Sequence, residues 1–328
     1  MSLMIWIRRT ASLLFLLALP ALAQAPAGGD YPNKPIRVVV TFPPGGSTDA
    51  VIRLLAPRLS ERLGQQIVID NRPGAGGNIG LAIVAQAPAD GYTIGVGAAG
   101  GLAVNVSLYP KMPFDPAKDL KPVAMLAAIP FVIIGQPGLS PKTQGELVAY
   151  AKANPGKLSI GHGGNGTAMH LSAALFNQMS GAGLVEVPYK GSGPAALDVL
   201  AGQVSLAIVD LPSALPQIQA GKVTAYAVTS PQRLPTLPSV PTVADAGLPG
   251  YDSTGWFGVV APAATPTSII TRLHAEINAA LNDDAIKASI RKLGVEPVPE
   301  SRDAFEVYIR AETQKWANVV KTAGVKVD

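Results

Sequence analysis

Segments with the character of strands and helices alternate along this chain from residue 36 onward, and the alternation limits the folds open to it. The first strand segment, residues 36–42, is rich in β-branched apolar residues and is typical of a strand buried on both faces. A helix is expected next, beginning at Ser47 or Thr48 and ending before Gly64. Repetition of this unit predicts an α/β fold with largely parallel sheets.

The remaining segments repeat the same theme. Further strands are expected at 67–70, 92–97, 158–161, 184–187, 204–210, 223–228 and 256–260, and helices at 78–86, 143–154, 167–180, 266–281 and 301–322. Two sheets accommodate these strands better than one long sheet, and the apolar segments 128–134 and 255–260 are suited to cross between them. We expect one lobe from residues 31–128 with 258–328, and a second lobe from residues 129–257.

The N-terminal segment has the pattern of a secretion signal. Arg8 and Arg9 precede an apolar run at 11–22, and residues 21–23 (Ala-Leu-Ala) form a small-x-small cleavage pattern. The run is shorter than the roughly twenty residues that span a bilayer as a helix. A twin-arginine signal is the alternative, but the residues after Arg9 lack its usual Phe-Leu-Lys continuation. We expect general export to the periplasm and removal of residues 1–23.

Composition excludes several classes of protein. The chain has no cysteine, which excludes disulfides and thiolate metal sites. Its formal net charge is +4, aromatic residues make up 5%, and no run of Lys or Arg exceeds two residues, so nothing favours a nucleic-acid partner. Apolar residues make up 48% of the chain, enough for a large buried core.

A proline- and glycine-rich loop, Phe42-Pro-Pro-Gly-Gly-Ser-Thr-Asp49, joins the first strand to the first helix. Backbone N–H groups and two hydroxyls at a helix N-terminus favour an anion such as a carboxylate. The alternative is structural, with Gly45 and Gly46 making the turn while Ser47 and Asp49 cap the helix.

A second glycine-rich loop, Gly161-His-Gly-Gly-Asn-Gly-Thr167, lies between a strand and a helix. It matches G-x-G-x-x-G, and Glu186 lies near the position of a ribose-binding acid, which is typical of dinucleotide sites. The motif lies in mid-chain, however, and an exported protein meets little dinucleotide. Asn165 and Thr167 are candidate donors to an anion, while His170 in the following helix has either a structural role or a ligand contact.

Two further loops follow the carboxyl ends of strands, where ligands bind in open α/β sheets. One is residues 97–101 and the other begins at Asp210. Asp210 either accepts a hydrogen bond from an amine or hydroxyl of a solute, or caps the helix that follows Pro212.

The motifs of common enzymes are absent from the sequence. There is no cysteine nucleophile, no G-x-S-x-G and no H-E-x-x-H, and His162, His170 and His274 are not spaced as metal ligands, so we expect neither a metal nor a cofactor. Spacing leaves open a triad assembled in space. An exported serine hydrolase that uses Ser47 or Ser192 with His170 is therefore the enzyme alternative.

Motifs along most of the chain resemble one family. They are Tyr31-Pro-x-Lys-Pro-Ile-Arg, the 42–49 loop, Val68-Ile-Asp-Asn-Arg-Pro-Gly-Ala-Gly-Gly77, Asp90-Gly-Tyr-Thr, Asn105-x-x-Leu-Tyr109, Val187-Pro-Tyr-Lys-Gly191, Ala220-Gly-Lys222, Val240-Pro-Thr-Val-Ala-Asp-Ala-Gly-Leu-Pro249 and Ala261-Pro262. Together they resemble the Bug-type extracytoplasmic solute receptors of tripartite tricarboxylate transporters. This resemblance implies a type 2 periplasmic-binding-protein fold, with two α/β lobes, crossing hinge strands and a ligand cleft between the lobes.

The resemblance also implies a function. The protein is expected to capture a small carboxylate solute by lobe closure and deliver it to the membrane subunits of the transporter, as a monomer and without catalysis. A periplasmic chemosensory receptor is the other non-enzymatic alternative. The expected ligand-binding residues are Phe42, Gly45, Gly46, Ser47, Thr48, Asp49, Ala98, Ala99, Gly100, Gly163, Asn165, Gly166, Thr167, His170 and Asp210. His162 departs from the small polar residue usual at its position, and the sequence does not identify the solute.

Overall fold

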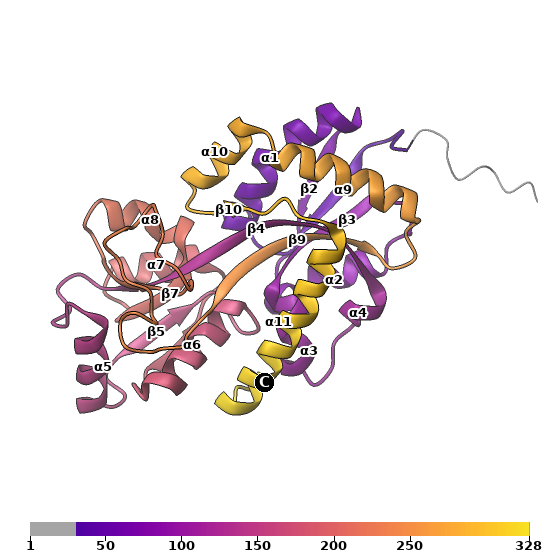
Figure 1. The fold of residues 1–328 in the computed structure, drawn as a ribbon. Coiled ribbons are helices and arrows are strands. Elements are labelled where there is room, and N and C mark those ends of the chain that lie inside the picture. Colours follow the sequence, from indigo (N-terminus) through magenta and orange to yellow (C-terminus); the bar gives the residue numbers. More distant parts are fainter. Residues whose placement is uncertain (1–30, 328) are drawn as a thin grey trace, which may run out of the picture. The chain divides into compact units, whose positions relative to one another are not determined.

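The computed structural model describes residues 31–327, so the predicted signal peptide at 1–23 lies outside the described residues. The strands of the described region form two sheets that share one long strand (Figure 1). Within residues 31–327, no helix combines the length and apolar character needed to cross a membrane.

The first sheet has the strand order β2-β1-β3-β9-β4, with β10 paired to β4. The first three of these strands are parallel, and the others pair antiparallel. The bounds are β1 Ile36–Val40, β2 Ile67–Asn71, β3 Thr93–Ala98, β4 Leu120–Gly135, β9 Thr254–Pro262 and β10 Glu296–Pro297.

The second sheet is built on the end of β4. Strands β7 and β8 pair antiparallel with β4, while β5 pairs in parallel with both β7 and β6. The bounds are β5 Ser159–His162, β6 Val185–Pro188, β7 Leu206–Asp210 and β8 Thr224–Val228.

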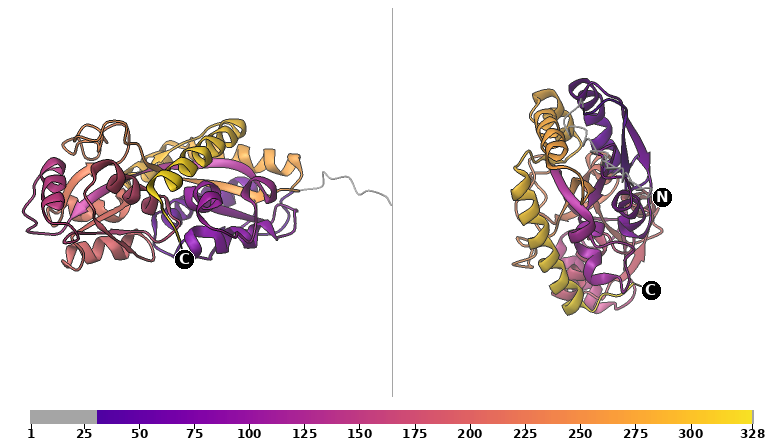
Figure 2. Two further views of the ribbon diagram at one scale, coloured as in Figure 1. Left: turned by 90° about the horizontal axis from the view of Figure 1, so that it is seen from below. Right: turned by 90° about the vertical axis from the view of Figure 1, so that its right-hand side faces the viewer.

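Helices follow most strands and cover the sheets (Figures 1 and 2). Their bounds are α1 Ser47–Leu63, α2 Asn78–Ala85, α3 Asn105–Leu108, α4 Pro116–Asp119, α5 Gln144–Ala153, α6 Ala168–Ser180, α7 Ser192–Leu200, α8 Leu211–Gln219, α9 Thr267–Leu281, α10 Asp284–Lys292 and α11 Arg302–Ala323, with short turns η1 Ala75–Gly77 and η2 Gly100–Val104. The α/β class and the two-lobed architecture predicted from the sequence are confirmed.

Strands β4 and β9 connect the two sheets. β4 pairs with β9 from Leu120 to Pro130, then with β7 from Phe131 to Gly135 and with β8 from Val132 to Gly135. The predicted crossing segment 128–134 is therefore only the last part of a 16-residue strand. The first half was missed because Lys121 and Pro122 interrupt its apolar pattern, and a register shift after Pro122 accommodates this interruption.

The C-terminal helix α11 is fixed to the crossing strands by a buried carboxylate. Glu312 is 5% exposed, and its Oε2 accepts hydrogen bonds from the indole N–H groups of Trp256 on β9 (3.1 Å) and Trp316 (2.8 Å). Both indoles are fully buried, so no water is available to replace this acceptor. One carboxylate therefore satisfies two buried donors at the junction of the helix and the sheet.

Replacement of this acceptor is expected to destabilise the fold. Glu312→Leu leaves two buried N–H groups unpaired and should lower the free energy of unfolding by about 2–4 kcal/mol, as measured by urea denaturation. Glu312→Gln keeps an acceptor oxygen and should lose less. Glu306→Leu, on a more exposed turn of the same helix, is the matched control and should change stability little. Equal stability of Glu312→Leu and the wild type would contradict this account of the junction.

Candidate functional site

A cavity of about 280 Å³ lies where loops from both sheets meet. It is bounded by the loops that follow β1, β3, β5, β6 and β7, and by the crossing region of β4 and β9. The lining residues are Phe42, Pro43, Pro44, Gly45, Gly46, Ser47, Thr48, Ala98, Ala99, Gly100, Ile129, Phe131, Thr167, Ala168, Met169, Lys190, Gly191, Ser192, Gly193, Pro194, Asp210, Ser213, Gly255, Trp256 and Phe257.

Four helices, α1, α6, α7 and α8, direct their N-termini at this cavity. Side chains cap two of these helices. At the start of α6 the Thr167 side chain accepts a hydrogen bond from the backbone N–H of His170, and at the start of α8 the Asp210 side chain accepts one from the backbone N–H of Ser213. The N-caps of α1 and α7 are Gly46 and Gly191, and neither helix has a side-chain hydrogen bond at its cap. Two helix N-termini, one beside each sheet, are thus left open toward an anion.

The two lobes touch at the edge of this cavity. Ser47 Oγ on α1 donates to Asp210 Oδ2 at the end of β7, over 2.7 Å. Glycines make a further contact, since a Cβ placed on Gly100 would lie 2.5 Å from the carbonyl oxygen of Gly166. The lobes are therefore in contact at the edge of the cavity, through a side-chain hydrogen bond and through a close approach of glycine backbone.

The far wall of the cavity is apolar. Ile129, Phe131, Met169, Trp256 and Phe257 line it, and each is less than 9% exposed. Among the described residues that line the cavity, the charged ones are Lys190, which is exposed, and Asp210, which is 5% exposed. The cavity thus combines an electropositive end made of backbone with an apolar body.

Many of the residues predicted from the sequence line this cavity. They are Phe42, Gly45, Gly46, Ser47, Thr48, Ala98, Ala99, Gly100, Thr167 and Asp210. Gly163 and Asn165 line an adjoining cavity of about 570 Å³, which shares Phe42, Thr167 and Lys190 with the first. Asp49, Gly166 and His170 line neither of these cavities. Solute contact by any of these residues stays a prediction.

Asp49 holds the first loop in shape. Its carboxylate accepts hydrogen bonds from Gly45 N–H, Arg53 Nε and Asn71 Nδ2. Burial alone raises the pKa of Asp49, but the bonds from Arg53, Gly45 and Asn71 outweigh burial and hold the pKa below its usual value. The predicted alternative in which Ser47 and Asp49 cap this helix is wrong, because Gly46 is the N-cap without a side-chain partner; Asp49 instead bonds the preceding loop at Gly45.

The hydroxyl of Thr167 is also used within the protein. Its proton is donated to the carbonyl oxygen of Gly164 over 2.7 Å, while its oxygen accepts from the backbone N–H of His170. A hydroxyl has one proton to donate, so Thr167 Oγ1 is not a free donor in this structure. The prediction from the sequence treated it as one, because the sequence does not reveal the Gly164 partner.

Sequence reasoning missed the α7 part of the cavity and most of its apolar wall. The glycine-bearing run at 191–194 directly before a helix was an available signal of the same kind as the 42–49 loop. The wall residues on β4 and β9 gave no such signal. A strand buried on both faces is apolar throughout, so its sequence does not show which side chains face a cavity.

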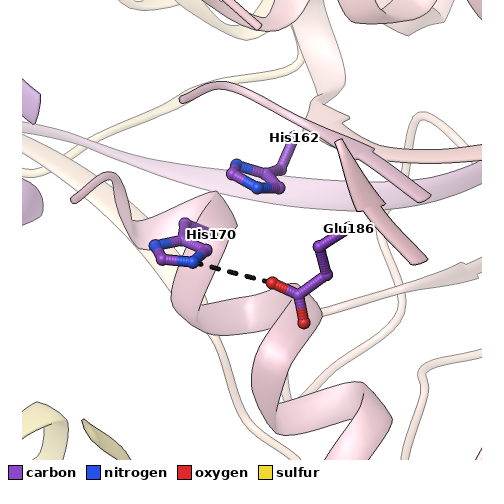
Figure 3. Close-up of side chains that lie close together, drawn as sticks. All are labelled: His162, His170 and Glu186. Atoms are coloured by element: carbon purple, nitrogen blue, oxygen red, sulfur yellow. Dashed lines mark ion pairs between the residues drawn. The ribbon is translucent and has the colours of Figure 1, made fainter. Parts of the chain in front are cut away.

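A pair of buried histidines supports the second glycine-rich loop. The His162 and His170 rings stack with centroids 4.7 Å apart, and the Nδ1 atoms accept from the N–H groups of Gly164 and Gly166 respectively. His170 Nε2 faces Glu186 Oε2 at 3.6 Å (Figure 3). Both histidines therefore act on the loop through its backbone.

The three side chains have the residue types of a metal site, but their hydrogen bonds fit one poorly. Candidate ligand atoms of His162, His170 and Glu186 lie within 4.8 Å of one another. Because each Nδ1 accepts a hydrogen bond, each neutral ring carries its proton on Nε2, which then has no lone pair for a metal. Nearly parallel stacked rings also direct their nitrogen atoms side by side rather than toward a common point.

The serine–histidine pair needed by the hydrolase alternative is not formed within the described residues. Ser47 Oγ donates to Asp210, and Ser192 Oγ contacts Met169 Sδ and the backbone N–H of Asp210. His170 instead contacts Gly166 and Glu186. No described serine is thus activated by His170 in this arrangement.

Acid is expected to destabilise the protein through the histidine pair. Burial lowers the pKa of His162 to about 3, with the neighbouring His170 adding to the effect, and lowers the pKa of His170 to about 4. The unfolded histidines, with a pKa of about 6.5, bind more protons than the folded ones between pH 6.5 and 4. Stability should therefore be complete above pH 6.5 and fall as pH drops, by about 1.4 kcal/mol per pH unit for each histidine.

Urea denaturation at several pH values measures this slope. The double variant His162→Asn with His170→Asn keeps acceptor oxygens near the Nδ1 positions and does not titrate, so its stability should fall less steeply over the same range. Glu186, which faces His170 in the wild type, is retained in both proteins, and burial raises its pKa against the opposing hydrogen bond from Asn177. An identical slope in the double variant would show that the pair is not the acid-sensitive element.

Comparison with known sequences finds one matching family model and relatives that align with most of the chain. The family model described as "Tripartite tricarboxylate transporter family receptor" matches residues 51–325. Protein BugT of Bordetella pertussis is 40% identical over 305 residues, which is 92% of this chain and 94% of BugT. A UPF0065 protein encoded between tcbD and tcbE in a Pseudomonas strain is 40% identical over 88% of this chain and 86% of its own length.

Solved structures give the same answer for the fold. Rpa4515 of R. palustris with adipate has a TM-score of 0.87 and 41% identity, and covers 90% of this chain and 99% of its own. The periplasmic binding protein BugD has a TM-score of 0.85 and 36% identity over 90% of this chain and 99% of its own. MatC of Rhodopseudomonas palustris with bound malate has a TM-score of 0.83 and 34% identity over 88% of this chain and 100% of its own.

The match over most of the chain, the shared two-lobed fold and the cavity between the lobes lead to one assignment: this chain belongs to the receptors of the tripartite tricarboxylate transporter family, a family of solute-binding receptors rather than enzymes.

Proposed function

We propose that this protein is a periplasmic receptor that binds a small carboxylate-bearing solute between its lobes and delivers it to the membrane subunits of a tripartite transporter. The observation that carries the proposal is the pair of uncapped helix N-termini, α1 and α7, which face one cavity from the two sides of the cleft. Adipate and malate in the structures of related proteins support a carboxylate as the solute class.

A carboxylate fits this end of the cavity for an electrostatic reason. The first N–H groups of a helix have no partner within the helix, and the helix dipole adds a partial positive charge at the same point. Oxygen atoms of a carboxylate accept hydrogen bonds from such groups without requiring a lysine or arginine. We place the carboxylate against the first turns of α1 and α7, with Gly46, Ser47, Thr48, Ser192 and Gly193 as the nearest residues.

The solute is expected to bind the closed form of the receptor more tightly than an open form. One open N-terminus belongs to each side of the cleft, so a single carboxylate reaches both only when the lobes approach. A solute that contacts both sides therefore shifts the population toward the closed form. We propose that the lobes are residues 31–128 with 258–328 and residues 129–257, that β4 and β9 act as the hinge, and that the membrane subunits recognise the closed form of a monomeric receptor.

Carboxylates are expected to stabilise the purified protein against heat. A ligand that binds only the folded state raises the melting temperature, by an amount that grows with its concentration relative to the dissociation constant. Screening carboxylic acids beside amides of the same carbon skeleton should show shifts of several degrees for one or more acids and none for the amides. Absence of any shift across the acids, or equal shifts with the amides, would contradict a carboxylate receptor.

A variant that hinders closure provides the control. A Cβ on Gly100 would lie 2.5 Å from the Gly166 carbonyl oxygen across the cleft and 2.8 Å from that of Gly76. Gly100→Ala should therefore lose most of the thermal shift with acid while its unliganded melting temperature verifies the fold. Gly145→Ala, on the exposed face of α5 with nothing within 4 Å, should keep the shift.

A further inference from the structure

Asp210 places a negative charge beside the end of the cavity that is open to anions. Its Oδ2 accepts from Ser47 Oγ over 2.7 Å, and its backbone N–H donates to Ser192 Oγ over 3.2 Å. Ser47 is the first residue of α1 and Ser192 is the first residue of α7. Asp210 is thus bonded to the start of both uncapped helices.

The carboxylate of Asp210 lacks a compensating cation. Its hydrogen bonds come from Ser47 Oγ and from Ser213 N–H at the start of α8, and within residues 31–327 no ion pair joins it to a lysine or arginine. The side chain is 5% exposed and lines the cavity. An ionised carboxylate accepts up to about four hydrogen bonds, so Asp210 retains capacity to accept from a solute.

The negative charge of Asp210 disfavours an anionic solute at this position, and only solutes of some structures offset this repulsion. A carboxylate on the first turns of α1 and α7 lies close to Asp210, and two like charges at short range in a buried site repel. A hydrogen-bond donor on the carbon next to the solute carboxylate removes this conflict, because it is directed at Asp210 while the carboxylate is directed at the helix N-termini. In this structure the Ser47 hydroxyl supplies such a donor.

We propose that the solute is a 2-amino or 2-hydroxy carboxylic acid with an apolar body, and that Asp210 is the specificity-determining residue that accepts from its 2-substituent. This inference rests on the proposed function and narrows it. The apolar body follows from the far wall, where Ile129, Phe131, Met169 and Phe257 present side chains without a charged partner for a second carboxylate.

Calorimetric titration with a matched series of six-carbon acids tests the inference. The probes are hexanoate, both enantiomers of 2-hydroxyhexanoate and of 2-aminohexanoate, and adipate. Wild-type protein should bind one 2-substituted acid at least tenfold more tightly than either hexanoate or adipate. Asp210→Asn should reduce that preference over hexanoate to less than threefold, because a neutral amide attracts an ammonium or hydroxyl donor less strongly and repels the carboxylate less.

A check of the helix cap and a matched charge-removing variant make the outcome specific to this side chain. Asn at position 210 retains an oxygen that can accept from Ser213 N–H, and its melting temperature verifies that the cap of α8 is preserved. Asp245→Asn removes the same charge at an exposed ion pair with Arg233 and should keep the full preference.

The results separate this inference from the proposed function. If hexanoate or adipate binds as tightly as every 2-substituted acid, or if the preference persists in Asp210→Asn, the inference is overturned while carboxylate binding stands. If no acid of this series or of the carboxylate screen binds, both the inference and the proposed function are contradicted. A preference for the amino or for the hydroxy acid identifies which donor Asp210 accepts from.

Discussion

The arrangement of this protein depends on the unsatisfied backbone N–H groups at the start of α1 and α7. Glycine at both N-caps leaves these groups without the side-chain partner that serine, threonine or aspartate would supply. Gly191 also has a φ of 110°, which other residues rarely adopt. The other two helices at the cavity have side-chain caps, which are Thr167 for α6 and Asp210 for α8. This contrast is the reason for proposing that α1 and α7, rather than α6 and α8, receive the carboxylate of the solute.

The sheets place these helix ends opposite one another. β4 belongs to both sheets, and β9 pairs with it across the junction, so the carboxyl ends of strands in both sheets face the same space. Glu312 holds α11 against this junction through two indole N–H groups, and the stacked histidines hold the second glycine-rich loop through its backbone. Neither group contacts the proposed anion position. Both stabilise the elements that create it, because loops this rich in glycine have little structure of their own.

Sequence reasoning succeeded where the signal was local and failed where it depended on distant contacts. The strand-to-helix loop at 42–49 and the crossing strands follow from apolar runs and glycine positions, and both are present in the structure. The roles of Thr167, His170 and Asp210 depend on partners such as Gly164, Gly166 and Ser47, and in the last case the partner is 163 residues away. No periodicity in the sequence encodes these pairings. Two roles for Asp210 were predicted from the sequence, an acceptor for the solute or a cap for the following helix. The structure shows the cap of α8, and neither prediction included the hydrogen bond from Ser47.

The most direct measurement is a crystal structure of the protein with a carboxylic acid that raises its melting temperature. The account predicts that the carboxylate oxygens lie within hydrogen-bond distance of backbone N–H groups in the first turns of both α1 and α7, with the lobes closed. A carboxylate bound instead in the adjoining cavity near Asn165, or held by lysine or arginine side chains away from those helix ends, would contradict it.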